Sequence, residues 1–222
     1  MSYDLNKIFT NDWNVVLKPF LATPEFTSIL DHVNSEISKG KVIYPPKKDV
    51  FKAFNVCSFV DTKVVILALD PYINEGQANG LAMAVNEGIS WPPTLQHLMV
   101  EFTDDIGKEM DTTFKTYAQK GVLFLNTALT VEKGKTKSHW DIWQPFTRFV
   151  FNQLELRGNI IYVLLGKEAQ EYENLIYDEQ IPIIKAVHPN AQSYRSNAGF
   201  YGSKIFSRVN SALIKQGHAA IF

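Results

Sequence analysis

The most constraining feature of this sequence is the apolar run at residues 64–69, VVILAL, which is followed directly by Asp70, Pro71 and Tyr72. A short, largely β-branched run of this kind is typical of a strand that is buried on both faces. Pro71 fixes its φ angle and has no N–H donor, so the chain turns sharply after Asp70. Ligands bind at the carboxyl ends of parallel strands in α/β folds. Asp70 is therefore either a site residue or a cap on the turn.

Three further segments, 121–131, 159–166 and 181–190, have the same strand-like character. Helical patterns lie between and around them at 12–21, 24–39, 95–102, 112–120, 141–156, 167–177 and 203–215, and a proline-containing loop over 42–54 leads into a short helix at Asp49. Strands that alternate with helices predict an α/β fold, in which a central four-stranded parallel sheet is flanked by helices on both faces. We expect one domain over residues 1–222, with a flexible N-terminal segment at 1–11.

Composition narrows the possible chemistry. Cys57 is the one cysteine, so the chain forms no internal disulfide and no cysteine metal cluster. The sequence has no Cys/His ligand spacing, Walker loop or G-x-S-x-G elbow, and we expect no metal and no cofactor. Without a signal-like segment or an apolar run of membrane length, we expect a cytoplasmic protein with no membrane contact. The net charge of −1 neither favours nor excludes DNA, because DNA binding needs a local basic surface.

Three polar residues stand at the ends of predicted strands or inside them. Asp70 ends one strand, His188 ends another, and Asn126 interrupts a third. An isolated Asn of this kind is usually a core residue whose amide is satisfied, because an unpaired amide costs about 1–3 kcal/mol. Three such residues on neighbouring strands converge on one sheet edge, and this convergence favours a functional site.

Several segments occur in the order found in one known family. They are YPPKKDVFKAF, LALDPYINEGQANGLAMAV, PPTL, GVLFLNTALTV, SHW, LLGKEAQ and HPNAQS. From about Trp13 to its C-terminus, the chain resembles the family 1 uracil-DNA glycosylases. The resemblance implies an enzyme that flips uracil out of DNA and hydrolyses its N-glycosidic bond without a metal, leaving an abasic site for base excision repair.

The resemblance also implies roles for single residues. Asp70 orients the attacking water and stabilises positive charge on the sugar, and His188 donates a hydrogen bond to uracil O2. The backbone N–H groups of Leu69 and Asp70 assist at the base, and Asn126 reads the uracil edge. Tyr72 fills the space beside uracil C5, which excludes the methyl group of thymine. Met83 occupies the position of the Phe that stacks on uracil, so we expect weaker uracil binding.

The surrounding loops are expected to hold the DNA backbone. The DNA-binding positions carried over from the family are Pro92, Pro93, Thr94, Gly166, Lys167, Asn190, Gln192, Ser193, Tyr194 and Arg195. Gln192 replaces the intercalating Leu of the family, and the aromatic or guanidinium group of Tyr194 or Arg195 is a candidate for stacking in its place. The lysines at 133, 135 and 137 either extend a basic track for DNA or form an ordinary solvated loop.

Other departures leave two alternatives open. Ala68 and Leu69 precede Asp70 where the family has Gly-Gln, and Ile73 stands where the family has His. One alternative is a DNA-binding replication accessory protein with weak or no catalysis, and the other is a glycosylase with shifted base specificity. Retention of Asp70, Asn126 and His188 favours an active enzyme. As partners we expect uracil-containing DNA, single- or double-stranded, and a DNA-mimicking inhibitor protein; we expect the protein to be a monomer.

Overall fold

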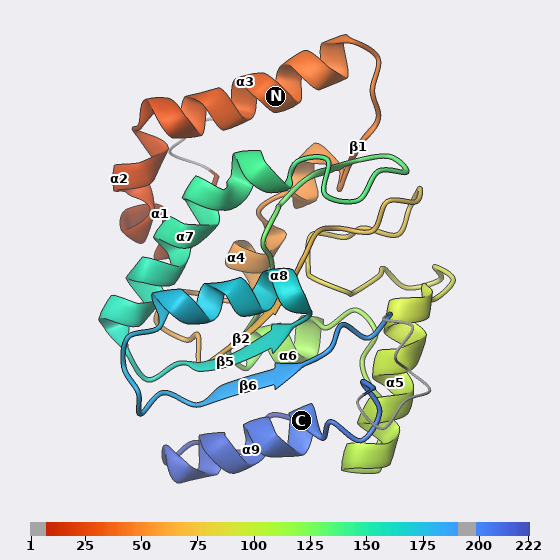
Figure 1. The fold of residues 1–222 in the computed structure, drawn as a ribbon, viewed down its shortest axis with the longest axis vertical. Coiled ribbons are helices and arrows are strands. Elements are labelled where there is room, and N and C mark those ends of the chain that lie inside the picture. The colour runs from red at the N-terminus through yellow and green to blue at the C-terminus, as the bar shows by residue number, and fades with distance from the viewer. Residues whose placement is uncertain (1–7, 191–198) are drawn as a thin grey trace.

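A four-stranded parallel sheet forms the centre of the computed structural model, which describes residues 8–190 and 199–222. Its strands lie in the order β3-β2-β5-β6, as Figure 1 shows in part. Their bounds are Val64–Ala68 for β2, Val122–Asn126 for β3, Ile161–Leu165 for β5 and Ile183–Ala186 for β6. Every residue of β2, β3 and β5 is buried, as expected for strands that are covered on both faces. The predicted α/β fold class is confirmed.

Helices cover both faces of the sheet. One layer contains α1 (Trp13–Val16), α2 (Lys18–Leu21), α3 (Pro24–Ser38), α4 (Lys52–Val56), α7 (Trp140–Arg157), α8 (Lys167–Gln170) and the 3-10 helix η2 (Glu171–Leu175). The other layer contains α5 (Pro93–Ile106), α6 (Lys115–Gln119) and α9 (Ile205–Lys215). Alternate strand residues supply the two cores: Val65 and Leu67 face the first layer, and Val64 and Ile66 face the second.

Two local signals set the ends of α5, the helix that borders the site. Pro93 is its first residue, a position where a missing N–H costs nothing. Gly107 ends the helix in the left-handed conformation, with φ of 74°. The helix therefore begins two residues before the predicted start at Leu95 and extends past Phe102.

Several predicted elements differ from the observed ones. The predicted strand at 121–131 divides into β3 and β4 (Val131–Glu132), and β4 pairs antiparallel with β1 (Ile43–Tyr44) in a separate two-stranded sheet. The strand at 181–190 ends at Ala186, so His188 lies in the following turn. The helix at 12–21 forms as α1 and α2, the helix at 112–120 forms only as α6, and the one at 167–177 forms as α8 and η2. The loop over 42–54 contains a 3-10 helix, η1 (Lys47–Asp49), before α4.

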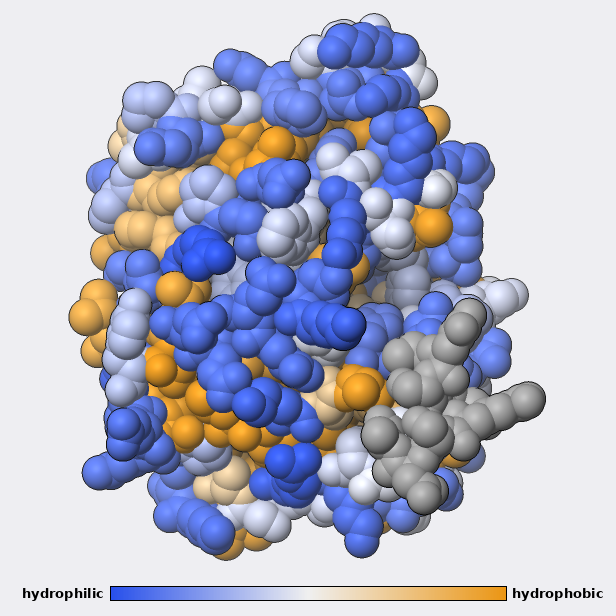
Figure 2. Space-filling model, in the orientation of Figure 1, coloured by the Kyte–Doolittle hydropathy of each residue, from blue (hydrophilic) through white to orange (hydrophobic). Residues whose placement is uncertain are grey.

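The N-terminal segment and the surface complete the description. Ile8 and Phe9, which we expected in a flexible segment, are buried in the first core. In the same segment the N–H of Thr10 donates to the Asn55 side chain and the Asn11 amide donates to the Phe54 carbonyl, each over 2.8 Å, whereas residues 1–7 lie outside the described residues. Hydrophilic residues dominate the face in Figure 2, with apolar patches between them. Within residues 8–190 and 199–222, no helix has the length and apolar character needed to cross a membrane.

Candidate active site at the carboxyl edge of the sheet

The turn after β2 is held firmly to the neighbouring strand. Ala68 at the end of β2 pairs in register with Asn126 at the end of β3. Beyond the strands, the N–H of Thr127 donates to the carbonyl of Ala68 over 2.8 Å, and the N–H of Ala128 donates to the carbonyl of Leu69 over 3.0 Å. The Thr127 hydroxyl also donates to Leu69, over 2.6 Å. These hydrogen bonds fix the backbone immediately before Asp70.

A cavity of about 340 Å³ opens at this edge of the sheet. Its volume lies in the range of small-molecule sites. Eight of the sequence-predicted site residues line it: Asp70, Tyr72, Met83, Pro92, Pro93, Thr94, His188 and Asn190. The other lining residues are Ala68, Pro71, Ile73, Asn74, Gln77 and Thr136. The structure thus brings Asp70, Tyr72, Met83 and His188 to one cavity.

Asp70 is partly buried in the wall of this cavity. The backbone N–H of Lys137 donates to its Oδ2 over 2.6 Å. Burial raises the pKa of Asp70 above its ordinary value of 3.8; the Lys137 hydrogen bond and charge lower it, and the nearby Glu168 carboxylate raises it. The ionised carboxylate is consequently held in place by a donor but only partly solvated, which is the environment of an anion that can act on a nearby charge.

His188 lies two residues beyond β6, where the loop after that strand forms a second wall of the cavity. The backbone N–H of Asn190 donates to its Nδ1 over 3.2 Å, so the ring proton is on Nε2. Burial lowers the pKa of His188 below 6.5, and the charge of Glu168 raises it. The side chain is thus a neutral imidazole near pH 7, with an N–H donor available to a ligand.

Tyr72 and Met83 form a joined pair at the cavity. The Tyr72 hydroxyl donates to the Met83 carbonyl over 2.8 Å, and burial raises the pKa of Tyr72. Met83 has a φ of 65°, which is uncommon for a residue other than glycine. The hydrogen bond therefore fixes the phenol ring against a strained piece of backbone.

Asn126 is placed beside the cavity rather than among its lining residues. It is buried as the last residue of β3, in register with Ala68, and not inside the strand as predicted. Its Oδ1 is buried and has no hydrogen-bond partner in the part of the chain that the structure describes. The sequence argument for a satisfied core Asn therefore does not hold for this atom.

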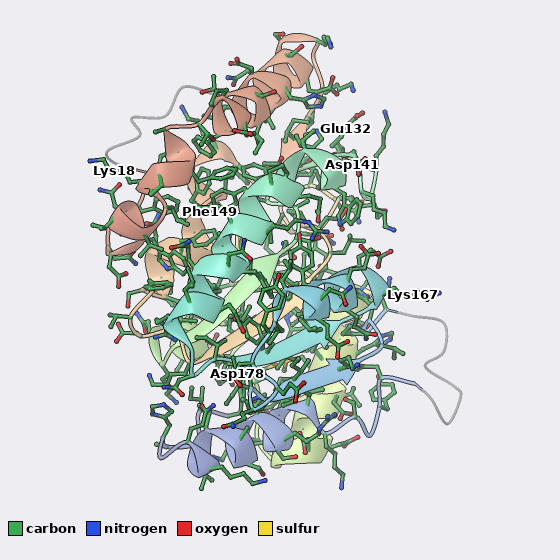
Figure 3. All side chains as sticks on the ribbon, turned by 60° about the vertical axis from the view of Figure 1, so that its left-hand side comes forward. Lys18, Glu132, Asp141, Phe149, Lys167 and Asp178 are labelled. Carbon is green, nitrogen blue, oxygen red and sulfur yellow. The ribbon has the colours of Figure 1, made fainter. Side chains whose placement is uncertain are left out.

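The expected DNA-binding residues are distributed around the cavity. Gly166 is buried beneath His188: a Cβ built on Gly166 would lie 3.1 Å from the His188 Cβ. Lys167 is exposed at the start of α8, on the side of the molecule where the strands end (Figure 3). Residues Gln192, Ser193, Tyr194 and Arg195 lie outside the described residues.

The three lysines of the predicted basic track all pair with carboxylates. Lys133 pairs with Glu75 over 3.1 Å, Lys135 with Glu132 over 2.6 Å, and Lys137 with Glu168. Their positive charges are therefore largely compensated within the protein, which favours the solvated-loop interpretation over a free basic track.

Sequence reasoning did not assign the remaining polar lining residues. Asn74 and Gln77 follow Asp70 in the same loop, next to Gly76, and this polar, glycine-containing stretch was the available signal. Thr136 comes from a loop that is distant in sequence, and no local pattern connects it with Asp70. No group of three or more His, Cys, Asp or Glu within residues 8–190 and 199–222 is arranged to hold a metal ion.

Comparisons with known proteins agree with this geometry. Residues 54–214 match the model of the uracil DNA glycosylase superfamily. The chain is 38% identical over 219 residues to a uracil-DNA glycosylase of Desulfitobacterium hafniense, covering 97% of this chain and 96% of the relative. It is 40% identical over 216 residues to that of Coxiella burnetii, covering 96% and 93%.

A solved structure has the same fold. An UNG variant of mimivirus in complex with UGI superposes with a TM-score of 0.89 at 21% identity, covering 99% of this chain and 90% of that one. At that identity the likeness concerns the fold, whereas the sequence relatives and the family model define the lineage. The chain belongs to the uracil DNA glycosylase superfamily.

Proposed function

We propose that the protein is a monofunctional uracil-DNA glycosylase that removes uracil from DNA and leaves an abasic site. The observation that carries the proposal is the single cavity shared by the Asp70 carboxylate, the neutral His188 imidazole and the Tyr72 ring. A base inside a duplex cannot reach such a cavity, so the uracil nucleotide must be flipped out of the stack.

The reaction breaks the bond between C1′ of the sugar and N1 of uracil. The bonding electron pair leaves with the base as a uracil anion, the oxygen of a water molecule bonds to C1′, and the proton that this water releases balances the charge of the departing anion. Positive charge develops on the sugar, where the Asp70 anion stabilises it and orients the water. Negative charge develops on the base, where the Nε2–H of His188 donates a hydrogen bond to uracil O2. An anion, Asp70, thus acts at the sugar end of the breaking bond, and a hydrogen-bond donor, His188, acts at the base end.

Base selection is assigned to Tyr72, Asn126 and Met83. The ring of Tyr72, fixed through its hydroxyl on the Met83 carbonyl, occupies the space beside uracil C5. The Asn126 amide offers a donor and an acceptor to the uracil edge, and its unpartnered Oδ1 is the acceptor for the uracil N3–H. Met83 contacts the base with a polarizable thioether in place of a flat aromatic face.

Backbone positioning is assigned to the loops around the cavity. Pro92, Pro93 and Thr94 line it at the start of α5, and Asn190 follows His188. Gly166 and Lys167 at the start of α8, together with Gln192, Ser193, Tyr194 and Arg195, complete the proposed contacts with phosphates and with the opened stack. We further propose that the protein acts as a cytoplasmic monomer, accepts single- and double-stranded substrates, and is bound by a DNA-mimicking inhibitor protein.

Alkali-revealed cleavage of a uracil-containing oligonucleotide, with EDTA present, tests this function. We expect cleavage by the wild type and its loss in Asp70→Asn and His188→Ala, both checked for folding by circular dichroism. A base panel of uracil, thymine and cytosine opposite guanine separates uracil specificity from a shifted specificity. A folded wild type that binds the DNA but does not cleave any of these would contradict the proposal and favour an accessory protein.

One observation favours that second candidate. Ile73, at the position of the family His, packs with a small apolar cluster of Tyr44, Ala78 and Val131. Its side chain has no polar atom with which to position water. The experiment above therefore decides whether Asp70 suffices for that task.

A further inference from the structure

The loop between β4 and α7, residues 133–139, passes over the turn that carries Asp70. We call it the strap. The N–H of Gly134 donates to the Ile73 carbonyl over 3.0 Å, and Thr136 lines the cavity. The N–H of Lys137 reaches Asp70 Oδ2 over 2.6 Å. A loop that is more than 60 residues away in the chain from Asp70 therefore supplies the hydrogen bond that holds its carboxylate.

Lys137 occupies this position at a conformational cost. Its φ is 61°, in the left-handed region, where a residue other than glycine is disfavoured by about 1–2 kcal/mol. Gly134, in the same strap, has a φ of 77° without that cost. A lysine at this strained position therefore indicates a role for its side chain.

The Lys137 ammonium pairs with Glu168 of α8. The two side chains are 51% and 26% exposed, so the pair adds little to stability in itself. The position of the ion pair in the site matters more than its contribution to stability. Glu168 follows Gly166 and Lys167, and Gly166 packs directly beneath His188. The ion pair thus connects the strap, which holds Asp70, with the segment that supports His188.

The charges of the pair act on both walls. Glu168 raises the pKa of Asp70 and of His188, whereas the Lys137 charge lowers the pKa of Asp70. The Lys137 hydrogen bond also lowers the pKa of Glu168, so Glu168 is a full anion at neutral pH. Tyr72 of the same turn and His188 are the other titratable residues that line the cavity with Asp70 in the described part of the chain.

We infer that Lys137 and Glu168 form a cross-site clamp that sets the charge felt by the Asp70 carboxylate and by His188. Lys137 is a positioning residue for Asp70, and Glu168 is its counterpart on the His188 side. Lys137 offsets the negative charge of Glu168, so that Asp70 can remain ionised next to a second carboxylate. The inference deepens the proposed function and rests on it.

The clamp predicts that substitutions of Lys137 and of Glu168 shift the pKa values of Asp70 and His188 in opposite directions. Lys137→Gln leaves Glu168 uncompensated, which raises the pKa of Asp70 and of His188 and moves the acid limb of the excision rate to higher pH. Glu168→Gln lowers both pKa values and moves the limb to lower pH. We expect each shift to be about half a pH unit, or about threefold in rate on the limb. The double variant returns the limb close to its wild-type position, and Lys137→Arg preserves it.

A second ion pair provides a matched control. Lys185 of β6 pairs with Glu173 of η2 over 2.9 Å, with side chains 47% and 41% exposed. Neither residue lines the cavity. Lys185→Gln and Glu173→Gln make the same changes in net charge as the clamp variants, and we expect both to leave the acid limb unmoved at constant ionic strength.

Two readouts separate the clamp from the proposed function. The first is single-turnover excision of uracil from an oligonucleotide between pH 4 and 8. The second is a carbon-13 NMR titration of the Asp70 carboxyl, assigned with Asp70→Asn, which needs no catalysis. Opposite shifts of the Asp70 pKa in Lys137→Gln and Glu168→Gln support the clamp even if the wild type is inactive, in which case only the proposed function fails. Shifts of equal sign, absent shifts, or equal shifts in the Lys185 and Glu173 controls overturn the clamp.

Discussion

The two walls of the cavity are built in different ways. On the Asp70 wall, hydrogen bonds from Thr127 and Ala128 hold the chain just before Asp70, and one from Lys137 holds the carboxylate itself. On the His188 wall, the ring is held by the N–H of the nearby Asn190 and by close packing on Gly166. The carboxylate is therefore positioned by contacts between distant segments, whereas the imidazole is positioned by its own turn and by van der Waals contact. Substitutions on the Asp70 wall should therefore act mainly through charge, and substitutions on the His188 wall mainly through packing.

We expect the largest effect from a substitution that removes the negative charge of Asp70 and keeps the shape of its side chain. Asp70→Asn retains an acceptor for the Lys137 N–H but no longer stabilises a cationic sugar. We expect the single-turnover rate to fall by about 10²–10⁴-fold with little change in DNA affinity. A fall of less than about tenfold would show that the anion is not the main contribution of this wall.

The pH dependence of the excision rate is the next largest expected effect, and it distinguishes the two walls. Burial raises the pKa of Asp70 above 3.8, so the ionised, active form is lost at a higher pH than for an exposed carboxyl. Burial lowers the pKa of His188 below 6.5, so the ring stays neutral through the physiological range. We expect a flat rate near pH 7 and a tenfold loss per pH unit below the controlling pKa. A limb at or above pH 6.5 that disappears in His188→Gln would contradict this assignment.

A methyl group tests the packing of the His188 wall. The Cβ of Gly166→Ala meets the His188 Cβ at 3.1 Å, and Gly166 has a φ of 91°. Gly158 is the control, because it has a φ of 73° and an added Cβ would have no atom of the described residues within 4 Å. Both variants carry the backbone strain, and only Gly166→Ala displaces the ring. We expect kcat to fall by about tenfold in Gly166→Ala alone. Equal activities in the two variants would mean that the ring adapts.

The smallest expected effect concerns the pair of Tyr72 and Met83. Tyr72→Phe removes the hydrogen bond to the Met83 carbonyl and keeps the ring. We expect a loss of about 1 kcal/mol in unfolding free energy, measured by urea denaturation, and less than tenfold in rate. Tyr72→Ala, by contrast, opens space beside uracil C5 and should permit detectable excision of thymine. If Tyr72→Phe alone excises thymine, the hydroxyl rather than the ring excludes the methyl group.

Much of this architecture was predictable from the sequence. The apolar run before Asp70 and the strands separated by helices were sufficient for a parallel sheet with helices on both faces, and strand ends that share an edge bring Asp70 near His188. Asn126 was assigned to the interior of a long strand, because the apolar pattern continues through residues 127–131 although the sheet pairing stops. Local periodicity does not report where a neighbouring strand ends.

The strap could not have been predicted in this way. Its path depends on the antiparallel pairing of β1 with β4 and on contacts with a turn far away in the chain. The sequence there shows only alternating lysines, which we read as a solvated loop or a DNA track. The acids that pair with them, Glu75, Glu132 and Glu168, come from three segments. Such pairings follow from tertiary structure and leave no local pattern.

The buried Oδ1 of Asn126 has a consequence for the folding equilibrium. An acceptor that is removed from water without a partner lowers the free energy of unfolding by about 1–3 kcal/mol. A bound base that donates an N–H to this atom recovers that free energy, and binding to the native state alone raises the melting temperature with ligand concentration. Under the role proposed for Asn126, uracil binding supplies the missing hydrogen bond, and the melting temperature then reports the fraction of the protein that is occupied.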